Sequence, residues 1–132
     1  MKVVMIIVRT LMGLLFLFAS ITFFLGLIQP PPMEGVPKAF NEGLAAVRYF
    51  FPMLKAVELT CGLLFVIGRA VPFATVLIAP VIVNIALYHF LVDRTPPGPY
   101  IASFLVIANL IVAWYYRDAY RPLFVSSGGS ST

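Results

Sequence analysis

The chain has 132 residues, of which 61% are hydrophobic and only 11% are charged. A typical soluble domain is about half apolar and about a quarter charged, so these proportions exclude an ordinary soluble domain. The net charge of +4 comes from basic residues that are scattered along the chain, which excludes a nucleic-acid-binding surface. We therefore expect a single-domain integral membrane protein whose main partner is membrane lipid.

Cysteine and histidine are too few for several kinds of redox and metal site. The single cysteine, Cys61, excludes an intrachain disulfide and a Cys-x-x-Cys exchange motif. The single histidine, His89, excludes a haem with two histidine ligands, and no cluster has the spacing of a metal site. We predict that the chain binds no metal. A quinone is the one cofactor that these counts leave as a possibility.

Four stretches are long and apolar enough for transmembrane helices, which need roughly 20 mainly apolar residues. They cover residues 3–28, 50–68, 72–92 and 100–116. The first is too long for the apolar part of a signal peptide, and Arg9 interrupts it, so we interpret it as a true span. The sequence predicts an all-α membrane protein, a four-helix transmembrane bundle over residues 1–124, followed by a flexible polar tail at 125–132.

The basic residues near the span ends predict the orientation of the bundle. The side that holds both termini carries Lys2, Arg9, Arg69, Arg117 and Arg121, whereas the other side carries Lys38, Arg48 and Arg94, together with Lys55 if its charged end reaches that surface. Because cytoplasmic flanks are richer in Lys and Arg, we expect both termini in the cytoplasm.

The segment 37–50, PKAFNEGLAAVRYF, predicts a short extracytoplasmic amphipathic helix between the first two spans. Apolar side chains recur at helical spacing along this segment and directly after it, at Phe40, Leu44, Val47 and Phe51. The helix either lies flat on the membrane surface or forms a lid over the outer mouth of the bundle. We prefer the flat helix, because amphipathicity alone indicates only contact with an interface.

Polar side chains at membrane depth are the candidate functional residues. Glu58, Asn84 and Asn109 lie near the middle of the second, third and fourth spans, so we expect them at one level near the bilayer centre. A charge at a span centre costs about 2.5 to 3.5 kcal/mol, and a polar contact between helices returns only about 0.6 to 2 kcal/mol. Stability alone therefore does not explain Glu58, and a functional role is the working hypothesis.

Helical phase adds further candidates, because small or polar faces should point into the bundle rather than into lipid. His89 lies five residues after Asn84, roughly 140° around a helix, so we expect the two on different faces. The predicted polar cavity contains Arg9, Lys55, Glu58, Asn84, His89 and Asn109. Its predicted walls are Gly13, Phe16, Ser20, Gly62 and Tyr88.

Structural roles are alternatives for several of these residues. Arg9 and Lys55 can extend their charged ends toward the membrane surfaces, and Asn84 and Asn109 can join helices through hydrogen bonds. Glu58 is either paired with Lys55 or Arg9, or protonated and neutral, and both alternatives stay open.

Four segments resemble the DoxX-like family of small four-helix membrane proteins: RTLMGLLF, KAVELTCGLLFVIGR, APVIVNIALYHFLVD and NLIVAWYYRDAYRPL. The resemblance covers residues 5–124. The family pattern falls on Arg9, Gly13, Phe16, Glu58, Gly62, Gly68, Asn84, His89, Asp93, Asn109, Tyr115 and Arg117. Ser20 and Phe23 stand where many relatives carry Gly and Lys, so a role of that Lys does not transfer.

The resemblance implies a four-helix bundle in the bacterial cytoplasmic membrane, and a link to quinone-coupled sulfur oxidation or to oxidative-stress complexes. Three functions follow in order of preference. The first is a redox-associated subunit that binds a quinone-like ligand, and it would be enzymatic only within a quinone-linked oxidoreductase. The second is a non-catalytic scaffold, and the third is a small-solute or proton-coupled transporter. A redox partner protein and a homo-oligomer are the partners considered.

Overall fold

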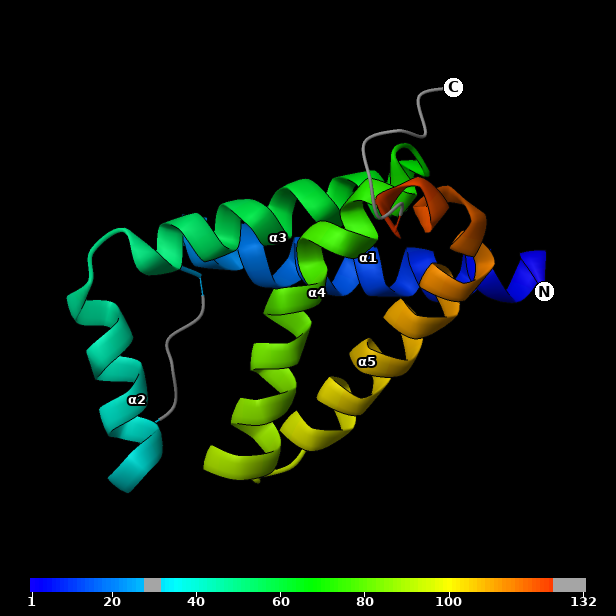
Figure 1. The fold of residues 1–132 in the computed structure, drawn as a ribbon. Helices are drawn as coiled ribbons and strands as arrows, with labels where there is room; N and C mark the ends of the chain where they lie inside the picture. The colour runs from blue at the N-terminus through cyan, green and yellow to red at the C-terminus, as the bar shows by residue number, and fades with distance from the viewer. Residues whose placement is uncertain (28–31, 125–132) are drawn as a thin grey trace.

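The computed structural model describes residues 1–27 and 32–124. The predicted polar tail and the end of the first predicted span lie outside these residues. The described residues form helices without any strand (Figure 1). The helices are α1 (Lys2–Leu25), α2 (Gly35–Ala46), α3 (Phe50–Ile67), α4 (Val71–Leu87), the π-helix η1 (Tyr88–Val92), α5 (Gly98–Tyr115) and the 3₁₀ helix η2 (Arg117–Phe124).

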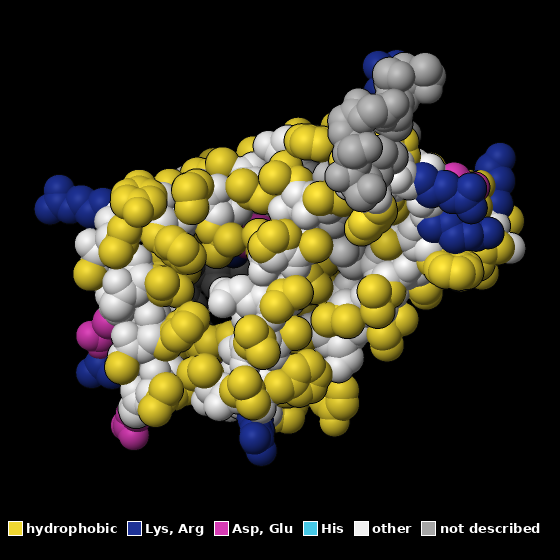
Figure 2. Space-filling model, viewed as in Figure 1, with side chains coloured by type: hydrophobic (Ala, Val, Ile, Leu, Met, Phe, Trp, Pro, Cys, Tyr) yellow, Lys and Arg dark blue, Asp and Glu magenta, His cyan; other side chains and the backbone are white. Residues whose placement is uncertain are grey.

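Four helical segments confirm the predicted all-α membrane fold. Lys2–Leu25, Phe50–Ile67, Val71–Val92 and Gly98–Tyr115 are each long and apolar enough to cross a membrane. The shortest have 18 residues, and at 1.5 Å per residue they reach roughly 27 Å, close to the hydrocarbon thickness of a bilayer. Apolar side chains cover the visible face of the molecule (Figure 2), as lipid-facing helices require. The chain is an integral membrane protein.

Two glycines set helix ends. Gly26 has a φ of 66° and Gly68 has a φ of 81°, both in the left-handed region that residues with a Cβ rarely adopt. Each N–H closes the last turn by bonding to a carbonyl of its own helix. The first helix therefore ends at Leu25, earlier than the predicted span end at residue 28.

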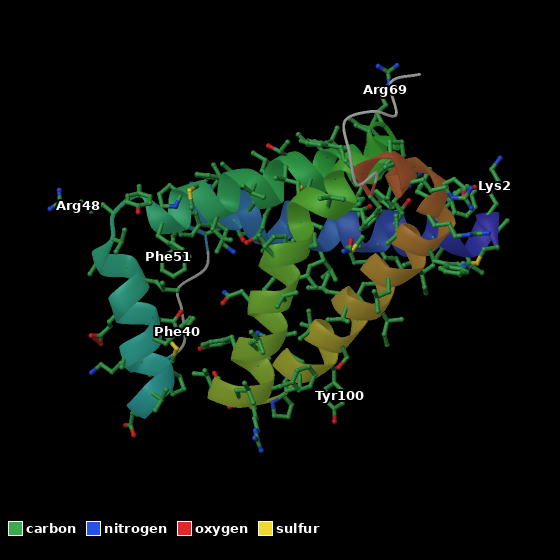
Figure 3. The ribbon with its side chains drawn as sticks, in the orientation of Figure 1. Lys2, Phe40, Arg48, Phe51, Arg69 and Tyr100 are labelled. Atoms are coloured by element: carbon green, nitrogen blue, oxygen red, sulfur yellow. The ribbon has the colours of Figure 1, made fainter. Side chains whose placement is uncertain are left out.

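The four long helices form two pairs. Helix α1 packs along α3, and α4 packs along α5, while contacts of α3 with α4 and of α1 with α5 join the pairs. In Figure 1 the pairs come together where α3 turns into α4, and they diverge toward α2. We call these two ends of the bundle the turn end and the α2 end. Lys2 and Arg69 lie at the turn end, and Arg48 lies at the α2 end (Figure 3).

The core toward the turn end is tightly filled by apolar side chains. Met12, Phe65, Ile78 and Val112 are fully buried there and come from all four long helices. The buried face of α4 consists of Val71, Ala74, Thr75, Ile78 and Ile82. Asn84 lies outside this buried face and is exposed, and apolar side chains of α4 make the core contacts.

Helices α1 and α3 cross at a contact between two glycines. A Cβ added to Gly13 would lie 2.9 Å from the carbonyl oxygen of Gly62, and one added to Gly62 would lie 3.0 Å from that of Gly13. Small residues allow membrane helices to approach this closely. Gly13 and Gly62 thus hold the crossing together.

Candidate functional site

A hollow of about 450 Å³ lies at the α2 end, among the long helices and α2. Figure 2 shows an opening into the molecule between α2 and α4. The volume falls within the range of about 300 to 1,000 Å³ that small-molecule sites occupy. The walls are mainly apolar and aromatic, and the polar side chains that line it are Asn41, Lys55, Glu58, Asn84 and His89.

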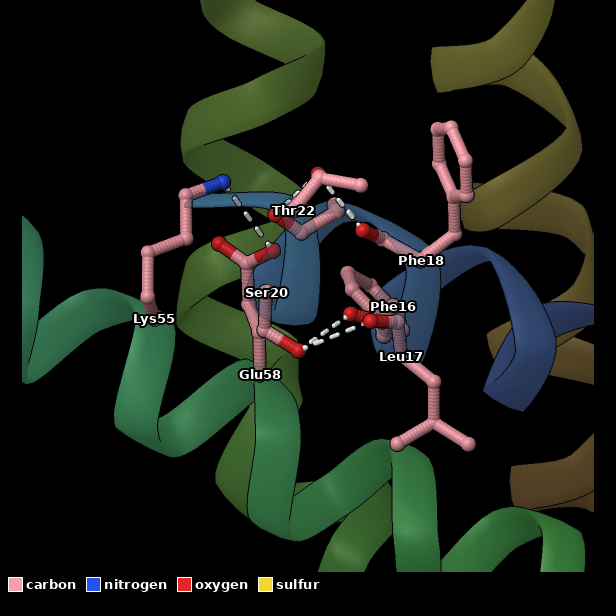
Figure 4. A network of polar contacts seen from close by, with 8 residues as sticks. Phe16, Leu17, Phe18, Ser20, Thr22, Lys55 and Glu58 are labelled. Atoms are coloured by element: carbon pink, nitrogen blue, oxygen red, sulfur yellow. Dashed lines mark hydrogen bonds and ion pairs between the residues drawn. The ribbon is translucent and has the colours of Figure 1, made fainter. Parts of the chain in front are cut away.

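Helix α3 contributes an ion pair to the hollow. Lys55 Nζ donates a hydrogen bond to Glu58 Oε1 at 3.4 Å (Figure 4). The two side chains lie one turn apart on the same face of α3, as their spacing predicts. The Glu58 side chain is only 4% exposed, whereas that of Lys55 is 21% exposed. Lys55 is therefore the partner of Glu58, and the pair presents both a donor and an acceptor to the hollow.

Helix α4 and the following η1 form the opposite wall. Asn84, Ile85, Tyr88 and His89 all line the hollow. Asn84 and His89 both line the hollow, although their spacing predicts that they lie on different faces of the helix. Asn84 is exposed and lines the hollow.

The imidazole of His89 has a defined orientation. Its Nδ1 atom is buried without a hydrogen-bond partner among the described residues, and the same ring edge packs against Gly98. The ring of Tyr88 meets it edge to face at 5.0 Å between centroids. Because His89 lines the hollow, the edge that carries Nε2 is the one left to face it.

Helix α2 covers part of the hollow. Phe40, Asn41 and Leu44 line it, and Figure 3 shows Phe40 and Phe51 in the space between α2 and α4. Asn41 Nδ2 donates a hydrogen bond to Tyr88 Oη at 2.9 Å, and the rings of Phe40 and Tyr88 lie 5.0 Å apart. These contacts support the lid interpretation over the flat surface helix that the sequence favoured.

Sequence reasoning missed Asn41 as a site residue. Asn41 is not among the apolar positions that define the amphipathic helix, yet it follows Phe40 directly and lines the hollow with it. Val47 shows the opposite error, since α2 ends at Ala46 and Val47 is 41% exposed.

The contact between Asn41 and Tyr88 predicts a change in lid mobility. Tyr88→Phe removes the hydroxyl that accepts the Asn41 hydrogen bond and keeps the ring that packs on Phe40. One neutral hydrogen bond contributes about 1 kcal/mol, so we expect roughly five-fold faster hydrogen exchange in residues 35–46. Tyr49→Phe is the control, because Tyr49 is 68% exposed and does not line the hollow. Equal hydrogen-exchange rates of residues 35–46 in both variants would show that the hydrogen bond between Asn41 and Tyr88 does not hold α2 in place.

Arg9 and Asn109 lie away from the hollow, toward the turn end. The guanidinium of Arg9 packs against Gly68, which is ten residues, roughly 15 Å along α3, from Glu58. Asn109 Nδ2 donates to the carbonyl of Thr75 at 3.3 Å, and Thr75 is nine residues, roughly 13 Å, from Asn84 on α4. The predicted common level of the polar residues therefore does not include Asn109, and Arg9 does not pair with Glu58.

Some of the predicted wall residues line the hollow, and others lie in the packed interior. Phe16 and Tyr88 line the hollow, as predicted. Gly13 and Gly62 lie in the crossing of α1 and α3, and Ser20 is buried with its hydroxyl donated to the carbonyl of Phe16 at 2.7 Å. None of these last three lines the hollow.

A charged carboxylate follows the α4–η1 wall. The backbone N–H of Thr95 donates to Asp93 Oδ1 at 3.0 Å. Hydrogen bonds from Thr95, together with the nearby His89, hold the pKa of Asp93 below its usual value. Asp93 is therefore ionised at neutral pH, just beyond the last membrane-spanning residue of this segment.

The hollow can bind and exchange protons with a small molecule. Lys55, Asn84 and His89 supply hydrogen-bond donors, and Glu58 supplies an acceptor that can also take a proton. Aromatic side chains provide flat apolar walls, at Phe16, Phe18, Phe40, Phe51 and Tyr88. Among the described residues, no group of three His, Cys, Asp or Glu side chains is placed to hold a metal ion.

Comparisons with known proteins leave the chain without a demonstrated relative. No family model matches it, and no curated protein or solved structure matches it significantly.

Proposed function

We propose that the chain binds a small lipid-soluble molecule with a quinone-like head group in the hollow, as a redox-associated membrane subunit of the DoxX-like type. One observation carries the proposal: donors and an acceptor from α3 and α4 line the same aromatic-walled hollow of about 450 Å³. Ligand sites commonly combine mostly apolar walls with a few polar groups in this way.

The chemistry of a quinone matches these groups. Its carbonyl oxygens accept hydrogen bonds, which Asn84, His89 and Lys55 can donate. Its reduction takes up protons, and Glu58 and His89 are the titratable groups suited to deliver them. A partner protein would supply the electrons, because the chain has one cysteine and its described residues contain no cluster of metal ligands.

The proposal includes an orientation in the membrane. Lys2, Arg69 and η2 lie at the turn end, which is also the side with more basic residues. The bias toward cytoplasmic basic residues favours this end in the cytoplasm of a bacterial cell. The hollow and its lid then lie toward the extracytoplasmic side.

The contacts away from the hollow favour ligand binding over a scaffold. The Gly13–Gly62 crossing and the Asn109–Thr75 hydrogen bond join helices without Glu58. Transport ranks third, because Met12, Phe65 and Ile78 fill the bundle beyond the hollow.

Glu58→Gln tests the proposal. The variant keeps the shape of the side chain and removes its charge, and a hydrogen bond to a charged group contributes about 1.5 to 3 kcal/mol. We expect a benzoquinol with a short isoprenyl tail, whose hydroxyls donate to the Glu58 carboxylate, to bind the variant at least about ten-fold more weakly than the wild type. Saturable binding to protein in lipid nanodiscs, followed by calorimetry, measures this difference.

The control is Glu42→Gln, which removes another carboxylate from the same end of the molecule. Glu42 pairs with Lys38 on the surface of α2, at 3.7 Å and with a side chain 64% exposed. We expect wild-type affinity in this variant. Absence of saturable quinone binding in the wild type, with Glu58→Gln assembled normally and Glu58→Leu lost from the membrane, would instead support the scaffold.

A further inference from the structure

A second depression lies on the surface of the bundle between α1 and α5. It is a groove of about 400 Å³, lined by Leu11, Leu15, Tyr100, Ile101 and Phe104. These side chains are all apolar or aromatic, and the only polar atom among them is the hydroxyl of Tyr100. The groove offers no counterpart to the charged and amide groups of the hollow.

The groove and the hollow adjoin at two shared wall residues. Leu15 of α1 and Ile101 of α5 line both of them. Both side chains are also partly accessible at the surface, at 37% and 41% exposure. A molecule whose polar part lies in the hollow can therefore extend past these two residues into the groove.

The groove also lies in the same half of the bundle as the hollow. Tyr100 and Ile101 belong to the first turn of α5, which begins at the end of the bundle away from the turn end. Figure 3 shows Tyr100 projecting from this end of α5. The polar and the apolar site thus adjoin at a similar depth.

We infer that the groove binds the hydrocarbon tail of the molecule whose head group occupies the hollow. This inference rests on the proposed function and extends it, because it assigns the ligand to tailed, lipid-soluble compounds. A water-soluble solute would use the hollow alone. A tailed quinone would use the polar hollow for its ring and the adjoining apolar groove for its chain.

Photo-crosslinking tests where the tail lies. The probe is a benzoquinone with a saturated tail that carries a diazirine midway, added to the full chain in lipid nanodiscs. After irradiation we expect labelled peptides that cover Leu11 to Leu15 and Tyr100 to Phe104. An excess of the tailless benzoquinone should reduce this labelling at least about ten-fold, because it displaces the head group from the hollow.

A pair of variants separates the tail site from the head site. Leu11→Trp fills the groove at a residue that does not line the hollow. It should reduce labelling of residues 100–104 by about ten-fold and leave the affinity for the tailless benzoquinone unchanged. Leu14→Trp is the control, since Leu14 is 50% exposed and lines neither site.

The outcomes distinguish failure of this inference from failure of the proposed function. Labelling that spreads over exposed apolar residues of all helices and resists competition indicates a probe dissolved in the bilayer, and overturns the tail site. Competed labelling confined to α2 and α4 also overturns it, because the tail then leaves by the other side. If the tailless benzoquinone does not bind at all, the proposed function itself fails.

Discussion

Gly13→Val is expected to destabilise the bundle by about 3 kcal/mol, because it introduces side-chain atoms where α1 and α3 already touch. Even a Cβ at this position would lie 2.9 Å from the Gly62 carbonyl oxygen, from Phe65 Cβ and from Val66 Cγ2. The first two atoms belong to the backbone or are attached directly to it, so neither can rotate away. The two helices must therefore separate.

The measurement for Gly13→Val is unfolding in mixed micelles with increasing SDS, followed by the loss of helical circular dichroism. Gly43→Val is the matched control, because Gly43 is also helical and a Cβ there meets nothing within 4 Å. The free energy of unfolding of Gly43→Val should differ from the wild type by no more than about 0.5 kcal/mol, which is the difference in helix propensity between glycine and valine. Similar losses in both variants would show that α1 and α3 do not need the close approach.

Gly98→Ala is expected to weaken binding of the benzoquinone probe at least about ten-fold, because the new methyl group displaces His89. A Cβ at residue 98 would overlap Nδ1 of His89, and it would lie 2.6 Å from Cε1 and 3.1 Å from Cγ. Since Cγ is also too close, the whole ring has to move. Because His89 lines the hollow, any displacement of its ring changes the wall of the hollow.

A double-mutant cycle checks this cause, using binding calorimetry in nanodiscs and SDS unfolding. His89→Ala removes the ring, so adding Gly98→Ala to it should change neither affinity nor stability further. In the wild-type background the same substitution should also destabilise the bundle by about 1 to 3 kcal/mol. If Gly98→Ala has equal effects in both backgrounds, the collision with His89 is not their cause.

The helices and part of the site follow directly from the sequence. Helix length depends on the apolar stretches, and one-turn spacing is enough to place Lys55 beside Glu58 on one face of α3. Asn84 and Tyr88 line the same hollow because helical phase is a local property. These predictions needed no knowledge of how the helices are arranged.

Relations between helices could not be predicted in the same way. The level of Asn109 was inferred by treating the spans as parallel, but the two pairs diverge, and Asn109 bonds to Thr75 near the turn end. The buried face of α4 depends on which side meets α3 and α5, so Thr75 and Ile78 are buried while Asn84 is exposed. The position of α2 depends on the contact of Asn41 with Tyr88, which lie 47 residues apart in the chain.

Only one end of the bundle is filled by side chains, and this determines from which leaflet a ligand could reach the protein. Met12, Phe65, Ile78 and Val112 make the half near the turn end solid, whereas the hollow and the groove occupy the half near α2. Under the proposed function, a lipid-soluble ligand would therefore enter and leave from the leaflet near α2. Molecules dissolved in the other leaflet would have to cross the bilayer unaided before they reached the protein, so the protein would sample a single leaflet of the membrane.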